Sequence, residues 1–347
     1  MILNILVWGV SINMNNIGKA LVTGGTGFIG SALTKKLVDL GVPVRVLDNN
    51  TRGKAERLSS CIDQIEYING DVTDYEQVFD ACKDIDTIFH LAFINGTDNF
   101  YNHPEKVLEV GVKGALTTLD AALQLNVKNY VVTSSSEVYQ EPTTIPTKED
   151  ERIIIPDIMN PRFSYSGGKI ITELLTIHYT AKSELRTIII RPHNFYGPDM
   201  GMGHVIPQFI TKMKQLSGNF TKKSIDFPIQ GSGLETRAFC YIDDAIDGLI
   251  MSAVKGEKGQ IYHLGTEEEV SIIQLAEMIA EILGLKINII SGDLLVGGTK
   301  RRCPSISKAS KIGYEPKYSL LQGLNKTVSW YVDNQSEEID KVEELVR

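Results

Sequence analysis

The chain has 347 residues, of which 42% are hydrophobic, and this length allows one large α/β domain or a domain with a smaller lobe. Its 43 acidic side chains outnumber 35 basic ones, and the net charge of −8 argues against a nucleic-acid partner. Four widely spaced cysteines form no Cys-x-x-Cys pair, which favours reduced cytoplasmic thiols over disulfides or a metal site. No apolar run approaches the roughly 20 residues needed to cross a bilayer, so no membrane association is expected.

Residues 1–15 precede the first strand that we predict. This stretch is apolar but short, and it has neither a basic start nor a small-residue cleavage signature, so a signal peptide is not expected. The following strand needs to begin only near Asn16, and Met14 stands just before it. We therefore interpret residues 1–15 as a leader or as the product of a misassigned start.

A glycine-rich loop follows the first predicted strand, Ala20–Val22. Gly24, Gly27 and Gly30 are spaced three apart, and an amphipathic helix then runs to about Leu40. Glycines let the backbone turn tightly and let a pyrophosphate approach the main chain, and the N-terminus of the helix stabilises the anion. The layout predicts a dinucleotide-binding loop.

The next predicted strand, Val42–Leu47, ends in Asp48. A carboxylate about 20 residues beyond the glycines can accept hydrogen bonds from the adenosine ribose. Because it also repels a 2′-phosphate, Asp48 favours NAD, while the nearby Arg52 leaves NADP open. After a third strand around 66–68, Asp71 is a candidate acceptor for the adenine amino group or for a helix N-cap.

Strands and helices alternate through the rest of the first half. We predict strands at Ile85–Leu91, Asn129–Thr133 and Leu185–Ile190, and helices at Pro104–Leu125 and from Arg162 to about Lys182. A small residue such as Ala92 at the end of a strand lets a cofactor pass close by. The alternation predicts an α/β fold with a Rossmann doubly wound parallel sheet, which binds ligands at the carboxyl ends of its strands.

The pattern loosens after residue 190. A strand at Gln260–Leu264 is expected to return to the sheet, and an amphipathic helix is expected over Ser271–Leu283. We therefore predict a cofactor domain over 16–190, with returns from the later half, a smaller C-terminal lobe over 191–335, and a charged tail over 336–347.

Tyr165 and Lys169 are one helical turn apart, so both side chains project from one face of their helix. An ammonium group beside a phenol favours the phenolate, and a tyrosine tuned in this way can exchange a proton with a sugar hydroxyl. Ser135 lies in the serine run after the fifth strand and can hydrogen-bond the same reacting oxygen. These three residues predict a catalytic centre that acts on a hydroxyl group.

Together these motifs resemble a known enzyme family. The chain is similar to the extended short-chain dehydrogenases/reductases of the NAD-dependent nucleotide-sugar epimerase/dehydratase family. The segments that carry this resemblance are, in chain order, Thr23–Gly30, Asp48, Asp71–Val72, His90–Ala92, Ser134–Tyr139, Tyr165-x-x-x-Lys169, Arg191–Pro198, Arg237–Asp243 and Arg302–Ser305. The resemblance implies a Rossmann domain that holds NAD and a C-terminal lobe that holds a nucleotide-diphosphate sugar. It also implies a homodimer packed through the two long helices.

The resemblance further implies roles for individual residues. Ser135 and Tyr165 would flank the sugar hydroxyl, usually at C4, while Lys169 assists and Tyr165 takes the proton as hydride leaves to nicotinamide. Substrate contacts are expected from Ser136, Asn194, Arg237 and Arg302, with both arginines on the diphosphate. Cofactor contacts are expected from Gly24, Gly27, Phe28, Ile29, Asp48, Asn49, Asp71, Val72, Leu91, Ala92, Tyr165 and Lys169.

Two neighbouring positions bear on the later chemistry. The 4,6-dehydratases of the family usually have an acid at the position of Ser136, so dehydration is disfavoured here, although Glu137 remains as a catalytic base. The run around Glu137 is similar to UDP-glucuronate decarboxylases, in which Glu137 and Arg302 would hold and polarise the substrate. Segments 160–165 and 196–207 look more like bacterial enzymes that modify nucleotide hexoses for surface glycans.

We therefore expect a C4 oxidoreductase of the epimerase or 4-dehydrogenase type. A UDP-glucuronate decarboxylase and a 4,6-dehydratase are the alternatives, and a non-catalytic NAD sensor is disfavoured because both Tyr165 and Lys169 are present. One departure from the family pattern is Gly111, which stands where a helix asparagine is usual. Glycine at this position puts in question any relay through water or the backbone that relatives build around that asparagine.

Overall fold

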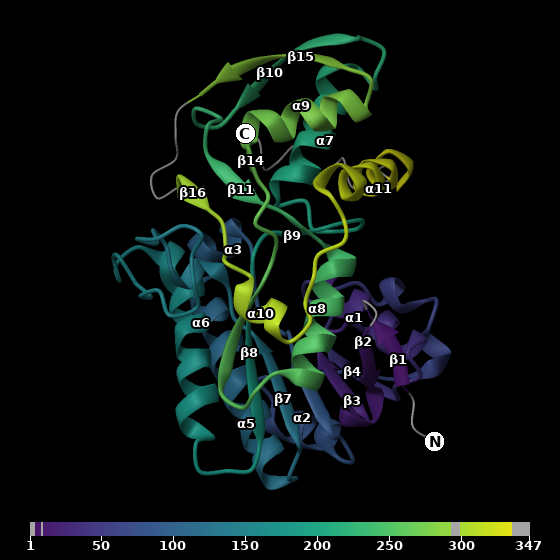
Figure 1. Ribbon diagram of the computed structural model, residues 1–347, viewed down its shortest axis with the longest axis vertical. Helices are drawn as coiled ribbons and strands as arrows, with labels where there is room; N and C mark the ends of the chain where they lie inside the picture. Colours follow the sequence, from purple (N-terminus) through teal and green to yellow (C-terminus); the bar gives the residue numbers. More distant parts are fainter. Residues whose placement is uncertain (1–3, 8–9, 293–298, 335–347) are drawn as a thin grey trace.

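The computed structural model describes residues 4–7, 10–292 and 299–334 (Figure 1). Strands β1 (Asn4–Val7) and β2 (Val10–Asn13) pair antiparallel, so the described part of residues 1–15 forms a hairpin. The charged tail expected at 336–347 lies outside the described residues. No helix in the described ranges combines the length and the apolar character that crossing a membrane requires.

A seven-stranded parallel sheet forms the centre of the lower half in Figure 1 and confirms the predicted fold class. Alternate side chains of β3 point to opposite faces, so Ala20 and Val22 join one apolar core while Leu21 joins another. In spatial order the strands are β13 (Gln260–Leu264), β8 (Arg186–Pro192), β7 (Asn129–Thr133), β6 (Thr87–His90), β3 (Ala20–Thr23), β4 (Val44–Asp48) and β5 (Ile65–Asn69).

Helices cover both faces of this sheet. Leu33 and Leu37 of α1 and Leu249 of α8 pack into the core that holds Val22, while α2 and α5 supply Val78 and Leu119 to the other core. The bounds are α1 (Phe28–Asp39), α2 (Tyr75–Cys82), α3 (Thr97–Asn102), α5 (Gly114–Gln124) and α8 (Ile242–Lys255). Short 3₁₀ turns are η1 (Met14–Asn16), η2 (Ala55–Leu58), η3 (Ile62–Gln64), η5 (Ser136–Val138) and η6 (Pro161–Phe163).

The two long helices of the prediction are interrupted in the structure. Over 104–125, α4 (Pro104–Leu108) passes into a π-helical turn, η4 (Glu109–Lys113), before α5 begins. Gly111 lies in the middle of this turn, and the ring of Phe93 occupies the place where a side chain at 111 would stand. The other helix divides in the same way into α6 (Ser164–Leu174) and the π turn η7 (Leu175–Tyr179). Such turns widen the helix locally and are frequent near functional sites.

The upper part of Figure 1 is a smaller lobe built from the later half of the chain. From it, α8 and β13 return to the large sheet; the return of β13 was predicted, and the structure pairs it with β8. The predicted helix after Ser271 begins with a capping box between Ser271 and Gln274. The lobe contains β9 (Phe195–Tyr196), α7 (Val205–Leu216), β10 (Ser224–Ile229), β11 (Thr236–Ala238), β12 (Cys240–Tyr241), β14 (Glu269–Ser271), α9 (Ile272–Ile282), β15 (Lys286–Ser291), β16 (Arg301–Arg302) and α11 (Leu320–Asn334). The short helix α10 (Ser307–Lys311) packs against β13 of the large sheet.

Candidate active site

The glycine loop lies where the sheet reverses its strand order. β3 and β6 are neighbours, and the chain continues from β3 to β4 and β5 on one side but from β6 to β7 and β8 on the other. In open α/β sheets such a switch point leaves a crevice at the carboxyl ends of the strands. Gly24 follows β3, Leu91 follows β6, and both line the same cavity.

The loop requires glycine at position 24. Its φ is +73°, and a Cβ atom there would lie 2.7 Å from the backbone nitrogen of Ala92. The helix α1 starts directly from this loop with Gly27 as its N-cap, and no side chain caps its first N–H groups. These N–H groups favour an anion. The loop therefore fits a pyrophosphate.

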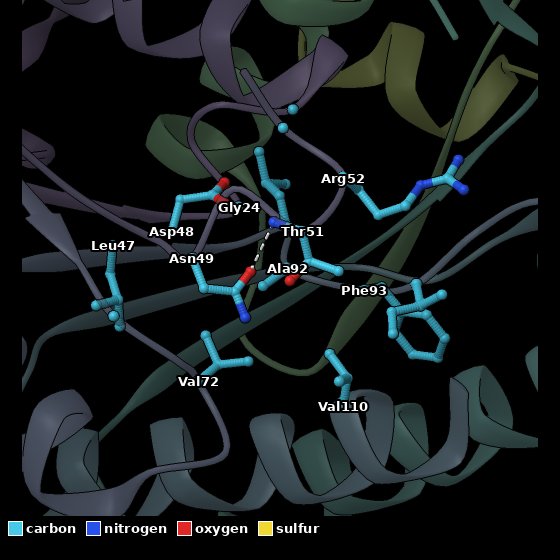
Figure 2. A pocket seen from close by; sticks show the side chains of 15 residues that line it. Gly24, Leu47, Asp48, Asn49, Thr51, Arg52, Val72, Ala92, Phe93 and Val110 are labelled. Carbon is cyan, nitrogen blue, oxygen red and sulfur yellow. Dashed lines mark hydrogen bonds between the residues drawn. The ribbon is translucent and has the colours of Figure 1, made fainter. Parts of the chain in front are cut away.

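Most of the predicted cofactor contacts line one of two adjoining cavities. Asp71 makes its own contact with Asn49, whose Nδ2 donates to the carboxylate at 3.0 Å. The cavity in Figure 2 is lined by Gly24, Gly27, Asp48, Asn49, Val72, Leu91 and Ala92, and the larger one by Gly24, Gly27, Phe28, Ile29, Leu91, Tyr165 and Lys169.

Asp48 is buried at the wall of the cavity in Figure 2. Its Oδ2 accepts the N–H of Thr26 at 2.9 Å and its Oδ1 accepts the N–H of Asn50 at 2.8 Å, so the carboxylate is held in one orientation. Arg52 points away from Asp48 in Figure 2, toward the side where Phe93 lies. The cavity therefore presents a carboxylate without the Arg52 guanidinium beside it.

Lys169 projects from α6 into the larger cavity, which has a volume of about 420 Å³. Its Nζ donates to the carbonyl oxygen of Thr133, at the end of β7, at 2.7 Å. The same atom lies 3.8 Å from the centroid of the Phe93 ring and 5.8 Å from that of Tyr165. Burial lowers the pKa of Lys169 to about 7, while the carboxylate of Glu173 opposes that shift.

The phenol of Tyr165 differs from the sequence-based expectation. Burial raises the pKa of Tyr165 to about 12, and hydrogen bonding from the Ser135 side chain offsets only part of the shift. Lys169 directs its Nζ to the Thr133 carbonyl rather than to the phenol. The shift in the pKa of Tyr165 runs opposite to the predicted stabilisation of a phenolate.

Ser135 and Glu137 come together at the turn that follows β7. Ser135 is the N-cap of η5, and its Oγ accepts the N–H of Glu137 at 3.1 Å. Oε1 of Glu137 accepts a hydrogen bond from Nη1 of Arg302, in β16, at 2.7 Å. Burial raises the pKa of Glu137, but the Arg302 guanidinium, together with Arg162 and Arg237, outweighs burial and the net pKa is lowered. Both side chains line the larger cavity.

Of the other predicted substrate residues, Ser136 and Asn194 lie at this cavity, whereas Arg237 is not among the residues that line it. Nδ2 of Asn194 donates to the carbonyl of Ala238 at 2.9 Å. Arg237 donates to the backbone carbonyls of Thr236 and Thr299, at 2.7 and 2.6 Å.

The electrostatics of this region favour an anion. Burial lowers the pKa of Arg237 to about 10, and Arg302 adds to that shift. Arg162 and Arg302 line the larger cavity together with Glu137. The hydroxyl of Ser134, a residue that lines the same cavity, is buried and has no hydrogen-bond partner among the described residues.

Phe93 is a residue of the site that the sequence reasoning missed. It lines both cavities and touches Lys169. The signal that would have found it is indirect: Gly111 and Gly168 are glycines inside helices, and each gives room to the Phe93 ring. As to metals, the described ranges hold no group of three or more His, Cys, Asp or Glu side chains arranged to bind an ion.

The family is shown by comparison with known proteins. The model of the NAD dependent epimerase/dehydratase family matches residues 20–265. The chain belongs to this family. The match covers the whole seven-stranded sheet, including β13, and extends through β11 and β12 of the lobe.

Individual relatives can be aligned with most of the chain. It is 32% identical to UDP-glucuronic acid decarboxylase 1 of Xenopus tropicalis, over 90% of this chain and 72% of the relative. It is 30% identical to UDP-N-acetyl-alpha-D-glucosaminuronate decarboxylase of Bacillus cytotoxicus, over 90% of this chain and 97% of that one. The solved structure of DesIV, a dTDP-glucose 4,6-dehydratase of Streptomyces venezuelae with NAD bound, is 26% identical with a TM-score of 0.81, covering 91% and 98%.

Proposed function

We propose that this family member oxidises C4 of a nucleoside-diphosphate sugar and uses NAD as its cofactor. One observation carries the proposal: a single cavity is lined by the loop glycine Gly27 and by Ser135, Tyr165 and Lys169. When bound, NAD supplies a hydride acceptor. Gly24, Gly27 and the N-terminus of α1 would hold its pyrophosphate, and Asp48 its adenosine ribose.

The residues of the chain would then move and hold the proton. Tyr165 first loses its own proton to solvent, its phenolate then takes the proton of the C4 hydroxyl, and Ser135 shares a hydrogen bond with the same oxygen. The high pKa of Tyr165, about 12, makes its phenolate a strong base toward an alcohol. Lys169 lies next to this phenol and supplies the positive charge that favours ionisation when it is itself protonated. The residues 16–190 would thus bind cofactor and 191–335 the nucleotide sugar.

Among the fates of the 4-keto sugar, we propose decarboxylation of a hexuronate. The supporting observation is Arg302, a guanidinium in the same cavity as Tyr165 and bound to Glu137. A guanidinium suits a carboxylate at C5. In a 4-keto hexuronate the C5–C6 bond breaks, carbon dioxide leaves, and the electron pair forms a C4–C5 enolate that is then protonated at C5. The two decarboxylases among the relatives point to the same substrate class.

A C4 epimerase or 4-dehydrogenase for surface-glycan sugars is the second candidate. Glu137 already neutralises Arg302 in the structure, so the pair is also compatible with an uncharged hexose. Ser136, in contrast, has no acidic proton with which to expel water, and dehydration is therefore the least supported outcome.

Product mass after incubation with a panel of nucleotide sugars tests these proposals. The panel should contain UDP-glucuronate, UDP-N-acetylglucosaminuronate and the matching uncharged UDP-, GDP- and dTDP-hexoses, each with NAD. Loss of carbon dioxide from a uronate is the expected result, either alone, if the hydride returns to C4, or with loss of two hydrogens and release of a 4-keto pentose, if NADH accumulates. A new isomer of unchanged mass, or a product two hydrogens lighter with accumulated NADH, would support the second candidate. No turnover on any sugar by protein that binds NAD would overturn the proposed activity.

A matched pair of tyrosine variants checks the assigned acid–base role. Tyr165→Phe removes the phenol oxygen and is expected to lower turnover by at least about 100-fold, the usual scale of general acid–base catalysis. Tyr101→Phe makes the same change at a half-exposed site outside the cavity and is expected to leave turnover unchanged. Equal turnover in Tyr165→Phe and the wild type would contradict the role.

We further propose a homodimer that works in the cytoplasm. Leu108 of α4 and Ile171, Leu174 and Tyr179 of the α6–η7 helix are exposed hydrophobic side chains on helices that pack beside each other. A second copy would cover this face. All four cysteines are buried and unpaired, which suits a reducing compartment. Sedimentation of the wild type and of Leu174→Glu tests the dimer, because a charge at this face should release monomers.

A further inference from the structure

The aromatic ring of Phe93 lies against both of the paired residues of α6. Nζ of Lys169 stands 3.8 Å from its centroid, within the range of a cation–π contact. The ring meets the ring of Tyr165 edge to face, with centroids 5.2 Å apart and planes at 83°. Figure 2 shows Phe93 beside Val110 of η4, on the far side of the cavity from Asp48. The ring is therefore placed between the cofactor cavity and the catalytic pair.

Two helical glycines make the slot that holds this ring. A Cβ atom at Gly111 would collide with the Phe93 ring, and one at Gly168 would lie 3.0 Å from its Cζ. Neither glycine has a positive φ, so the backbone does not require glycine at these positions. Space for the ring is what requires them. The glycine found at 111 and the phenylalanine at 93 are therefore parts of one packing arrangement.

We propose that Phe93 is a positioning residue that holds Lys169 in place for the proposed oxidation, with Gly111 and Gly168 as its slot. The ring closes one side of the Lys169 side chain, and the Thr133 carbonyl accepts a hydrogen bond from Nζ on another. This role rests on the proposed function, because holding Lys169 in place matters only if Lys169 takes part in the oxidation. The contact between Phe93 and Lys169 does not depend on that function.

Phe93 acts on the charge of Lys169 in two opposite ways. Its bulk keeps water from the ammonium, which disfavours the charged form, and its π face attracts the ammonium, which favours it. The other groups that act on Lys169 are the Glu173 carboxylate, which favours the charge, and His90 and Tyr165 nearby. His90 is neutral because burial lowers its pKa to about 3, and Tyr165 is a neutral phenol at pH 7.

Two substitutions of Phe93 separate these effects. Phe93→Leu keeps the bulk but removes the π face, so the pKa of Lys169 should fall by roughly 0.5 to 1.5 units, the size of a cation–π contact. Phe93→Ala removes both and admits water, so the pKa of Lys169 should rise toward the usual lysine range. A role limited to filling space predicts no fall in Phe93→Leu.

The experiment measures Lys169 itself rather than turnover. The purified protein is labelled with acetic anhydride from pH 5 to 10, and peptide mass spectrometry gives the fraction acetylated at Lys169, whose midpoint is its pKa. NAD affinity of each variant is measured by calorimetry on the same samples. Because the labelling needs no sugar substrate, its result stands apart from success or failure of the proposed activity.

Matched glycine variants complete the test. Gly111→Ala drives a methyl group into the ring and should shift the labelling midpoint, and adding Phe93→Ala should remove the collision. Gly167→Ala, in the same helix as Gly168, places its Cβ 3.6 Å from Ile155, an ordinary contact, and should leave the midpoint unchanged. Midpoints that move in the same direction in Phe93→Leu and Phe93→Ala, or that do not move in either, would overturn the proposal.

Discussion

At the scale of single residues, the site depends on charged groups that sit away from bulk water. Lys169 is 3% exposed and Tyr165 8% exposed, so burial controls both of their pKa values. The side chains of Glu137 and Arg302 are more exposed than those of Lys169 and Tyr165, and each stabilises the charged form of the other. Two ionisable pairs therefore share one cavity, one shifted by burial and the other stabilised by opposite charge.

The Glu137–Arg302 pair makes a prediction for the fate of the oxidised sugar. Arg302→Gln leaves Glu137 without its charged partner, and turnover on a hexuronate should fall roughly 10- to 100-fold, as expected for a lost hydrogen bond between charged groups. Arg302→Lys keeps the charge and should retain more activity. Turnover on a uronate, followed by product mass, is the measurement. Full activity in Arg302→Gln would rule out a role for this pair in the reaction.

The burial of Lys169 predicts how the free energy of unfolding changes with pH. The pKa of Lys169 is about 7 in the folded chain and 10.5 in the unfolded chain, so between these values unfolding takes up a proton. The contribution of Lys169 to the free energy of unfolding therefore rises with pH from 7 to 10.5. Lys169→Met removes this term, so the variant should gain stability relative to the wild type, and gain more at pH 7 than at pH 10.

Urea unfolding of both proteins at the two pH values checks the prediction. Thr172→Val, one turn further along α6, is a matched control because it changes a buried residue without a titrating group. A difference between Lys169→Met and the wild type that is the same at pH 7 and pH 10 would contradict the shifted pKa.

At the scale of elements, one arginine side chain connects the glycine loop to the loop that follows β9 by hydrogen bonds. Arg57 of η2 donates from Nε and Nη2 to the Asp199 carboxylate, at 2.7 and 2.9 Å, and from Nη2 to its carbonyl at 2.8 Å. Nη1 of Arg57 also donates to the carbonyl of Thr26 in the glycine loop at 3.2 Å. Asp199 precedes Gly201 and Gly203, which line the larger cavity. One side chain therefore links the two loops.

A double-mutant cycle tests this link. Arg57→Ala and Asp199→Ala should each destabilise the chain, and the coupling between them should be about 0.5 to 3 kcal/mol, the range for residues in direct contact. Lys83→Ala with Asp80→Ala provides the control, because that ion pair is exposed and should couple by well under 1 kcal/mol. Additive effects of Arg57→Ala and Asp199→Ala in urea unfolding would show that the link is not formed in solution.

At the scale of the whole molecule, the larger cavity lies where the sheet and the smaller lobe meet. The seven-stranded sheet presents the glycine loop and Asp48 at the ends of its strands, while β16 brings Arg302 from the smaller lobe. The larger cavity receives side chains from both parts, including Lys169 and Asn194. Under the proposed function, the nucleotide sugar would contact both the sheet and the lobe.

The preference for NAD over NADP is also a prediction for the whole molecule, because a bound nucleotide stabilises the entire folded chain. NAD should raise the melting temperature more than NADP at equal concentration, since Asp48 repels a 2′-phosphate. Asp48→Asn should narrow the difference, whereas Asp63→Asn, an exposed residue of η3, should leave it unchanged. Differential scanning fluorimetry measures the shifts. An equal rise with both nucleotides in the wild type would contradict the role of Asp48.

The sequence by itself determined the class of fold and the place of the cofactor loop. The strand runs, the glycine spacing and the Tyr165–Lys169 interval are local patterns, and local patterns follow from backbone geometry and alternation of burial. They predicted β3, α1, β7 and the return of β13 to the sheet. The helix breaks at η4 and η7 were missed, because a π turn changes the register without any strong residue preference of its own.

Only the tertiary structure decided which distant groups meet. Glu137 and Arg302 are 165 positions apart, and no spacing rule relates them. The pKa values of Lys169 and Tyr165 depend on burial by several elements at once, which the interval of four residues does not encode. Gly111 was visible in the sequence as a departure from the family, but its reason, the ring of Phe93 in the space of the missing side chain, required both segments to be placed. Contacts within an element follow from periodicity, whereas contacts between elements follow from how those elements pack.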